Sequence, residues 1–158
     1  MRKNLLVCAL AVFAAALLSA PAALAAENWI GTWKLNAAKS KYSPGPMPKS
    51  LTLTYAATPE GVKFSSNGVD ADGKPVQSDF VSKFDGKDVP YTGNPNADTA
   101  SPKKVDDNTF ENTWKKAGAA TITARGVVSK DGKTLTITQK GKNAKGETVD
   151  ATVVFEKQ

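Results

Sequence analysis

Glycine-centred turn signals recur along this chain and divide it into short segments. The triplet Asp-Gly-Lys stands at residues 72–74, 85–87 and 131–133, and a looser relative, Lys-Gly-Glu, stands at 145–147. Asp-Gly is favoured where a tight hairpin turn needs a pair of positive φ angles, because the twist of that turn matches the flanking strands. The spacing therefore predicts a succession of antiparallel hairpins, and no segment shows helical periodicity.

The segments between these turns alternate apolar and polar residues with a period of two. The apolar faces consist of Leu51, Leu53 and Tyr55; Val62 and Phe64; Val76, Phe80 and Phe84; Phe110 and Trp114; Leu135 and Ile137; and Val149, Val153 and Phe155. Such alternation is typical of an antiparallel meander with one face in water. We count nine or ten strands, and closure of the meander removes its exposed edges. The sequence thus predicts an all-β, antiparallel up-and-down β-barrel rather than a sandwich.

Two segments depart from this pattern. Residues 39–50 carry Pro44, Pro46 and Pro48, which exclude a helix or a central strand. We expect this segment to run extended over the surface, and we call it the strap. Residues 91–104 hold two prolines and several Asn and Asp turn formers, and they predict a longer loop around a short strand near Thr99.

Residues 1–25 have the anatomy of a cleavable secretion signal. Arg2 and Lys3 precede an apolar run over residues 5–18, and Ala-Leu-Ala at residues 23–25 supplies the small side chains that a signal peptidase accepts. The run is shorter than the ~20 residues that span a bilayer. We expect cleavage near Ala25, a periplasmic or secreted location in a Gram-negative bacterium, and one domain over residues 26–158.

The composition excludes several kinds of site. The chain has no histidine, and its one cysteine, Cys8, lies inside the predicted signal. The predicted mature chain therefore lacks the His and Cys side chains that Ser-His or Cys-His catalysis and zinc binding require. We expect no catalytic residue, metal or cofactor. The lysines are scattered, which argues against a nucleic-acid partner. Outward lysines are costly in a bilayer, so we expect no membrane insertion. The sequence makes no prediction about oligomeric state.

Small and polar residues interrupt the apolar faces at Ser66, Ser78, Ser82, Asn112, Ala124 and Ala151. The side chains of an eight-stranded barrel just fill its interior, whereas more strands leave space. A barrel of nine or ten strands with this lining is expected to enclose a cavity. The alternative is a barrel that flattens like a sandwich and closes the space.

Three stretches resemble the calycin superfamily of lipocalins and fatty-acid-binding-protein-like barrels. They are the Gly-x-Trp segment at residues 31–35, the hairpin at residues 131–136 and the closing run at residues 153–157. The chain also resembles small secreted bacterial proteins described as lipocalin-like. The resemblance implies a barrel with one open end that binds a lipid or another small apolar molecule.

In lipocalins a basic residue from a late strand packs across the tryptophan of the first strand. The resemblance makes Arg125 a candidate to cover Trp33 by a cation–π contact. Two alternatives stay open for Arg125: contact with a ligand carboxylate, and a place on the outer surface. Alternation favours an outward side chain unless Gly126 marks a bulge.

The leading function hypothesis is non-catalytic binding or carriage of a small hydrophobic or amphipathic molecule inside the barrel. Trp33 is expected to plug one end. The candidate ligand-binding residues are Trp33, Phe64, Ser66, Phe80, Ser82, Asn112, Trp114, Arg125 and Phe155. A second hypothesis is an envelope interaction module with a filled barrel, which binds a protein or polysaccharide through residues 39–50 and 91–104. A third is an enzyme that uses only carboxylates and tyrosines such as Tyr42, Tyr55 or Tyr91.

Overall fold

The computed structural model describes residues 27–158, so the predicted signal peptide and its cleavage near Ala25 lie outside the described residues. The described chain forms ten strands and one short 3-10 helix. They are β1 (Gly31–Leu35), η1 (Ala37–Lys39), β2 (Ser50–Thr58), β3 (Gly61–Val69), β4 (Pro75–Ser82), β5 (Val89–Pro90), β6 (Thr99–Asp106), β7 (Thr109–Lys116), β8 (Ala119–Val128), β9 (Thr134–Lys142) and β10 (Thr148–Lys157).

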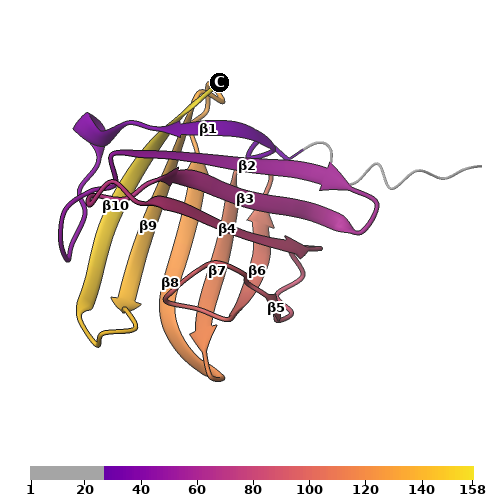
Figure 1. Ribbon diagram of the computed structural model, residues 1–158. Coiled ribbons are helices and arrows are strands. Elements are labelled where there is room, and N and C mark those ends of the chain that lie inside the picture. Colours follow the sequence, from indigo (N-terminus) through magenta and orange to yellow (C-terminus); the bar gives the residue numbers. More distant parts are fainter. Residues whose placement is uncertain (1–26) are drawn as a thin grey trace, which may run out of the picture.

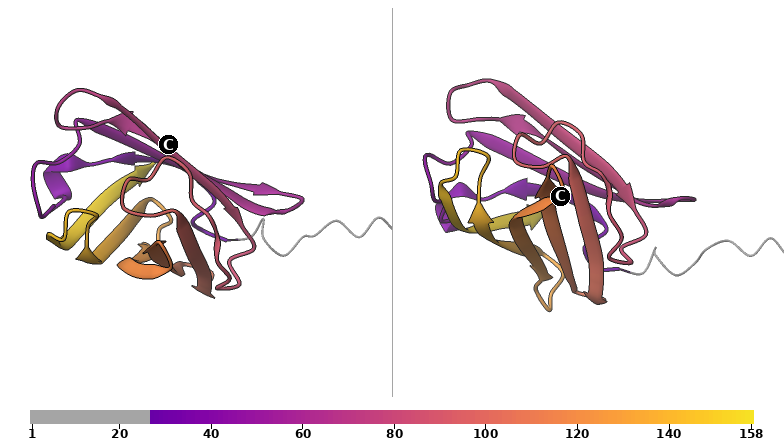
Figure 2. Two further views of the ribbon diagram at one scale, coloured as in Figure 1. Left: turned by 60° about the horizontal axis from the view of Figure 1, so that its bottom comes forward. Right: turned by 90° about the horizontal axis from the view of Figure 1, so that it is seen from below.

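All ten strands belong to one antiparallel sheet with the order β4-β3-β2-β1-β10-β9-β8-β7-β6-β5 (Figure 1). Every pair of neighbours is adjacent in sequence except β1 and β10, which join the first strand to the last. The sheet curves so that β1–β4 face β7–β10 across the interior (Figure 2). The predicted fold class, an all-β antiparallel up-and-down barrel of nine or ten strands, is confirmed with ten.

The turn signals lie where the sequence placed them, but their geometry differs from the prediction. In the β3–β4, β8–β9 and β9–β10 hairpins only the glycine has positive φ, at Gly73, Gly132 and Gly146. The amide of each glycine donates to the carbonyl three residues earlier. This is a type I turn followed by a left-handed glycine, as in three- and four-residue hairpin loops. The remaining triplet, residues 85–87, does not join paired strands, because it connects the two edge strands β4 and β5.

Backbone hydrogen bonds between the two sheet edges close the barrel. Asp79 of β4 exchanges two bonds with Thr92, with N···O distances of 3.0 and 3.1 Å. Further along, the Gly86 amide donates to the Pro102 carbonyl and the Lys104 amide donates to the Phe84 carbonyl. Both edges are therefore partly paired, which removes most of the hazard of exposed strand edges.

The predicted loop over residues 91–104 is too long, because residues 99–106 form strand β6. Pro102 lies in the middle of this strand, opposite Asn112 of β7. Its carbonyl accepts from Gly86, so its nitrogen faces the sparsely paired side, where a missing N–H breaks no ladder bond. Proline inside a strand was the reason for the wrong boundary.

Aromatic side chains fill the end of the barrel where β1 begins. Trp29 and Trp33 are 0% exposed, and the Trp33 indole donates to the Trp29 carbonyl at 2.8 Å. Trp29 packs on Phe84 and Phe110, with ring centroids 5.9 and 5.5 Å apart. We call this the closed end.

The segment before β1 is tied to the closed end by polar contacts. The Asn28 amide donates to the Asp107 carbonyl at 2.9 Å. The Lys104 ammonium bonds both the buried Glu27 carboxylate at 2.5 Å and Asp107 at 2.8 Å. The hydrogen bonds to Asp107 and Glu27 raise the pKa of Lys104. Residues 27–30 are thus part of the barrel floor rather than a tail.

Gly126 marks close packing and not a bulge. Its pairing with Phe110 is continuous with the pairs on either side, and the irregularity of the β7–β8 ladder lies between Trp114 and Lys115 instead. A Cβ atom on Gly126 would stand 2.3 Å from the Phe110 ring. The missing side chain therefore makes room for one of the rings of the closed end.

We expect Gly126→Ala to lower the free energy of unfolding by about 1–3 kcal/mol, because the new methyl group displaces the Phe110 ring. Urea unfolding measures the loss. In the double variant with Phe110→Leu, the smaller side chain clears the space, so the combined loss should fall short of the sum of the two single losses. Strictly additive losses would show that Phe110 does not restrict this position.

Candidate functional site

The barrel interior on the side away from the closed end is a cavity of about 430 Å³. The strands supply a wall that is mostly aliphatic and aromatic, including Leu53, Phe64, Phe80, Ile137 and Val153. The space exists because small side chains alternate with large ones along the inner face. Ala124 of β8, for example, stands opposite Asn112 of β7. The expected cavity is therefore present, and the flattened, filled barrel is not.

Six of the nine candidate residues predicted from the sequence line this cavity: Phe64, Ser66, Phe80, Asn112, Trp114 and Phe155. They come from β3, β4, β7 and β10, and strict alternation along these strands turns all six inward. The structure thus brings them together around one cavity. Whether they contact a ligand stays a prediction.

The other three candidates lie elsewhere. Trp33 is in the closed end, and Ser82 uses its hydroxyl to accept a hydrogen bond from the Phe84 amide at 3.0 Å. Arg125 is on the outer face, where it is half-exposed and forms an ion pair with Glu111 of β7. None of the three lines the cavity.

The predicted cap of Trp33 by Arg125 is wrong, and Lys157 takes that place. The Lys157 ammonium lies 5.1 Å from the centroid of the Trp33 ring. The two residues are cross-strand partners in the β1–β10 ladder, so the contact follows from the closure of the barrel. Alternation alone turns Arg125 outward, since Ala124 beside it faces inward. At an exposed site such a cation–π contact contributes on the order of 0.5–1 kcal/mol.

Four segments surround the mouth of the cavity, and the candidate list missed all of them. The lining there comes from the strap (Tyr42, Pro44, Met47 and Pro48), the start of β4 (Pro75, Val76 and Gln77), the β5–β6 loop (Gly93, Asn94, Pro95 and Asn96) and the β9–β10 turn (Asn143). The prolines of the strap could have indicated its place at the mouth, because they predict an extended surface segment, and such a segment can lie across an open barrel end.

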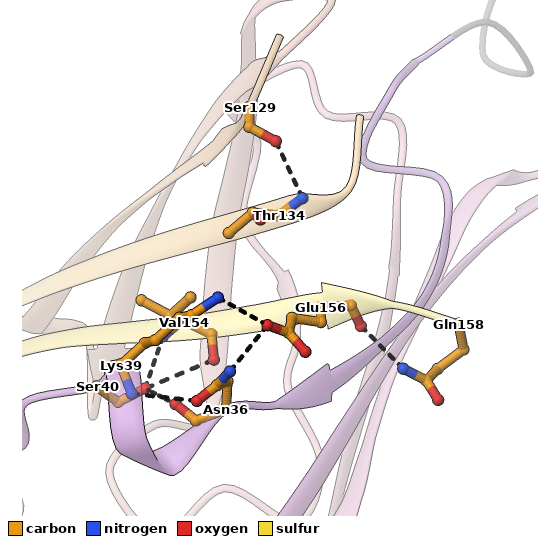
Figure 3. Close-up of polar contacts among 8 residues, drawn as sticks. All are labelled: Asn36, Lys39, Ser40, Ser129, Thr134, Val154, Glu156 and Gln158. Atoms are coloured by element: carbon orange, nitrogen blue, oxygen red, sulfur yellow. Dashed lines mark hydrogen bonds and ion pairs between the residues drawn. The ribbon is translucent and has the colours of Figure 1, made fainter. Parts of the chain in front are cut away.

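The first half of the strap is fixed to β10. The backbones of Lys41 and Thr152 exchange two hydrogen bonds, and the Asp150 amide donates to the Ser43 carbonyl. Within the turn that precedes them, the Ser40 hydroxyl accepts from the Val154 amide at 2.8 Å (Figure 3). The strap thus continues the pairing of β1 with β10, and it then leaves β10 to pass over the mouth of the cavity.

A carboxylate holds the turn at the start of the strap. Glu156 accepts from the Lys39 ammonium at 3.0 Å and from the Asn36 side-chain amide at 2.8 Å (Figure 3). The bonds from Lys39 and Asn36 lower the pKa of Glu156. This ion pair is exposed, so it orients the turn more than it stabilises the fold.

The aromatic side chains of the cavity form a continuous wall. Phe64 stacks on Phe80 with centroids 4.8 Å apart, and Phe80 meets the edge of Tyr91 at 5.3 Å. Tyr91 in turn packs against Trp114 at 5.7 Å. The wall bridges the seam where β4 meets the β5–β6 segment, so ring packing supports the few hydrogen bonds that close the barrel there.

The buried polar groups of the cavity fall into two sets. Ser66 and Ser78 share a hydrogen bond of 2.7 Å, and the Ser78 hydroxyl donates to the Tyr91 oxygen at 3.3 Å. On β7, Asn112 Oδ1 and Trp114 Nε1 are buried without a hydrogen-bond partner among the described residues. A buried polar group without a partner costs roughly 1–3 kcal/mol. A ligand that forms hydrogen bonds with the second set would therefore remove this cost.

No ionised side chain lines the cavity among residues 27–158. The lining includes Tyr42, Tyr55 and Tyr91, and burial raises the pKa of each phenol. These groups are therefore neutral near pH 7, where they donate or accept hydrogen bonds but do not act as bases. The cavity is suited to binding through shape and hydrogen bonds.

Two further searches concern the same described residues. No group of three or more Asp, Glu, His or Cys side chains is placed to hold a metal ion. No helix there has the length and apolarity needed to cross a bilayer.

Comparison with known proteins finds similar solved structures but no sequence family. No family model matches the chain, and no curated protein sequence matches it. A crystal structure of zebrafish ileal bile acid-binding protein complexed with cholic acid matches with a TM-score of 0.47 and 12% sequence identity. The match covers 84% of this chain and 99% of that chain. The strand order of the chain itself shows the up-and-down barrel expected from the sequence.

We expect Trp33→Ala to lower the free energy of unfolding by ~3–5 kcal/mol, because it empties a fully buried site and removes the bond to the Trp29 carbonyl. Chemical unfolding followed by circular dichroism measures the loss. Trp114→Ala is the matched control, since Trp114 borders the cavity and is only partly buried. Equal losses in the two variants would show that Trp33 is not part of the floor that holds the barrel closed.

Proposed function

We propose that this protein binds a small hydrophobic or amphipathic molecule in the cavity beneath the strap. The observation that carries the proposal is an aromatic-lined cavity of about 430 Å³ in the barrel interior. Small-molecule sites are mostly apolar clefts of about 300–1,000 Å³ with a few placed polar groups. The lining has this composition, and the volume of the cavity lies within this range.

The physical reason for binding is the incomplete packing of the wall. Rings such as Phe64 and Phe80 have atoms on the cavity side that meet no protein partner, so they forfeit dispersion energy that a ligand restores. Burial of apolar ligand surface adds about 25 cal/mol for each Å² removed from water. The strap contributes apolar side chains, Met47 among them, at the place where a bound molecule would meet solvent.

Two other hypotheses from the sequence fit the site less well. The envelope interaction module needed a filled barrel, and this one holds a cavity. Its two contact segments, the strap and the loop after β5, border the mouth of that cavity instead. The enzyme hypothesis needed carboxylates or reactive tyrosines, but no carboxylate lines the cavity within residues 27–158 and the tyrosines there are neutral phenols. The proposed function is therefore non-catalytic.

The proposal is tested by filling the cavity. Ala124→Phe places a ring next to Asn112, and we expect it to weaken binding of a neutral fluorescent naphthylamine probe at least tenfold, because overlap with the ligand removes the space it occupies. Val127→Phe is the matched control, since Val127 is on the outer face of the same strand. A fluorescence titration of folded protein measures both, and thermal unfolding checks each fold.

Native mass spectrometry of protein purified from its host adds an independent measurement. A co-purified small molecule, lost in Ala124→Phe and kept in Val127→Phe, would support the proposal. If the protein carries no small molecule and takes up no probe, the cavity is not a binding site.

We also propose that the chain is exported, on the basis of residues 1–25 alone. The expected mature protein starts at Ala26, because the small residues before it suit signal peptidase. Intact-mass analysis of periplasmic and culture fractions measures this. Full-length protein in the cytoplasm would contradict export. The double variant Ala23→Arg and Ala25→Arg removes the small residues that signal peptidase accepts, so it should block cleavage.

A further inference from the structure

Asn112 and Trp114 form a pair of unsatisfied polar groups on the wall of the cavity. They are two residues apart on β7 and so project from the same face of the strand. Asn112 is only 7% exposed. Its Oδ1 atom is an acceptor and the Trp114 Nε1 atom is a donor, and neither has a hydrogen-bond partner among the described residues.

The surroundings of the pair leave room for a small polar group. Ala124 and Ile122 of β8 stand directly opposite Asn112 and Trp114, and the alanine offers little bulk beside the amide. On the other side, the Trp114 ring is held by the edge of Tyr91. Residues two apart on a strand are separated by about 7 Å, so one small group between them lies within reach of both side chains.

The remaining polar groups of the cavity do not need a ligand as a hydrogen-bond partner. Ser66, Ser78 and Tyr91 already bond to one another. Arg125, the cation that a carboxylate ligand would need, is outside the barrel and paired with Glu111. The cavity wall formed by residues 27–158 thus offers an acceptor and a donor side by side, with no compensating charge.

We propose that the ligand is uncharged and presents a hydroxyl group to Asn112 and Trp114, in the manner of a long-chain alcohol or a sterol. This inference rests on the proposed function and names the ligand class for the same cavity. A hydroxyl group donates through its hydrogen and accepts through its oxygen, so it satisfies Asn112 Oδ1 and Trp114 Nε1 together. An ionised carboxylate only accepts, so it cannot satisfy Asn112 Oδ1, and it would be buried without a cation.

Three probes with the same ten-carbon chain separate the possibilities: decanol, decyl methyl ether and decanoate. Displacement of the naphthylamine probe at about pH 8, where the carboxyl group is ionised, gives their affinities. We expect decanol to bind roughly three- to tenfold more tightly than the ether, because the ether cannot donate to Asn112. Decanoate is expected to bind more weakly than both.

Two variants assign the two hydrogen bonds to these side chains. Asn112→Leu keeps the volume without the amide, and Trp114→Phe keeps an aromatic ring without the N–H group. Asn112→Leu should reduce the ratio of ether to decanol dissociation constants toward one, while the ether itself still binds. Trp114→Phe should weaken decanol and the ether alike, because the oxygen of each accepts from Nε1. Thr113→Val is the control, because Thr113 lies between the two residues and points to the outer face.

The outcomes distinguish the ligand class from the function. Equal affinity for decanol and its ether, tightest binding of decanoate, or a preference for decanol that survives in Asn112→Leu would each overturn the ligand class and leave the cavity as a binding site. If none of the probes binds, the proposed function fails as well.

Discussion

Strands β1 and β10 pair with each other, and within residues 27–158 this is the sheet's only pairing between strands that are not consecutive in sequence. Without it β1–β4 and β5–β10 would be held together only by the few backbone bonds between β4, the segment after it and the β5–β6 region. The pairing spans only three residue pairs, from Trp33 with Lys157 to Leu35 with Phe155. It holds because the fully buried Trp33 ring packs behind it and Lys157 covers that ring. The strap then extends the pairing along β10.

This closure gives the barrel two different ends. Near β1 the rings of Trp29, Phe84 and Phe110 fill the interior, and Gly126 makes room for one of them. Toward the other end the inner face carries small residues, so the walls are held apart without being filled. The strap and the β5–β6 loop border this space. A barrel with one filled and one hollow end follows from where the large side chains lie along each strand, and not from the number of strands alone.

The chemistry of the hollow end is set by what alternation turns away from it. Charged residues such as Glu111 and Arg125 occupy outward positions of β7 and β8, and they pair there in solvent. The inward positions of the same strands hold Asn112, Trp114 and Ala124. Because period-two alternation separates the two sets completely, a binding site in this interior is neutral, and polar specificity depends on a few hydrogen-bonding groups.

Much of the candidate site was predictable because one rule, alternation within a strand, decides which side chains face inward. It placed Phe64, Ser66, Phe80, Asn112, Trp114 and Phe155 correctly on the cavity wall. It could not separate residues at different heights along the barrel, so it grouped Trp33 and Ser82 with them. It also said nothing about segments outside the strands, which is why Tyr42, Met47 and the loop after Tyr91 were missed.

The sequence by itself determined the all-β class, the positions of three hairpin turns and the direction of most strand side chains. These properties depend on local backbone preferences and on residues close together in the chain. The tertiary structure decided that Lys157 rather than Arg125 covers Trp33, that Pro102 fits inside a strand and that the strap borders a cavity. Each of these depends on residues far apart in sequence, brought together when β1 pairs with β10 and the sheet edges meet. Local patterns carry no information about which distant residue completes such a contact.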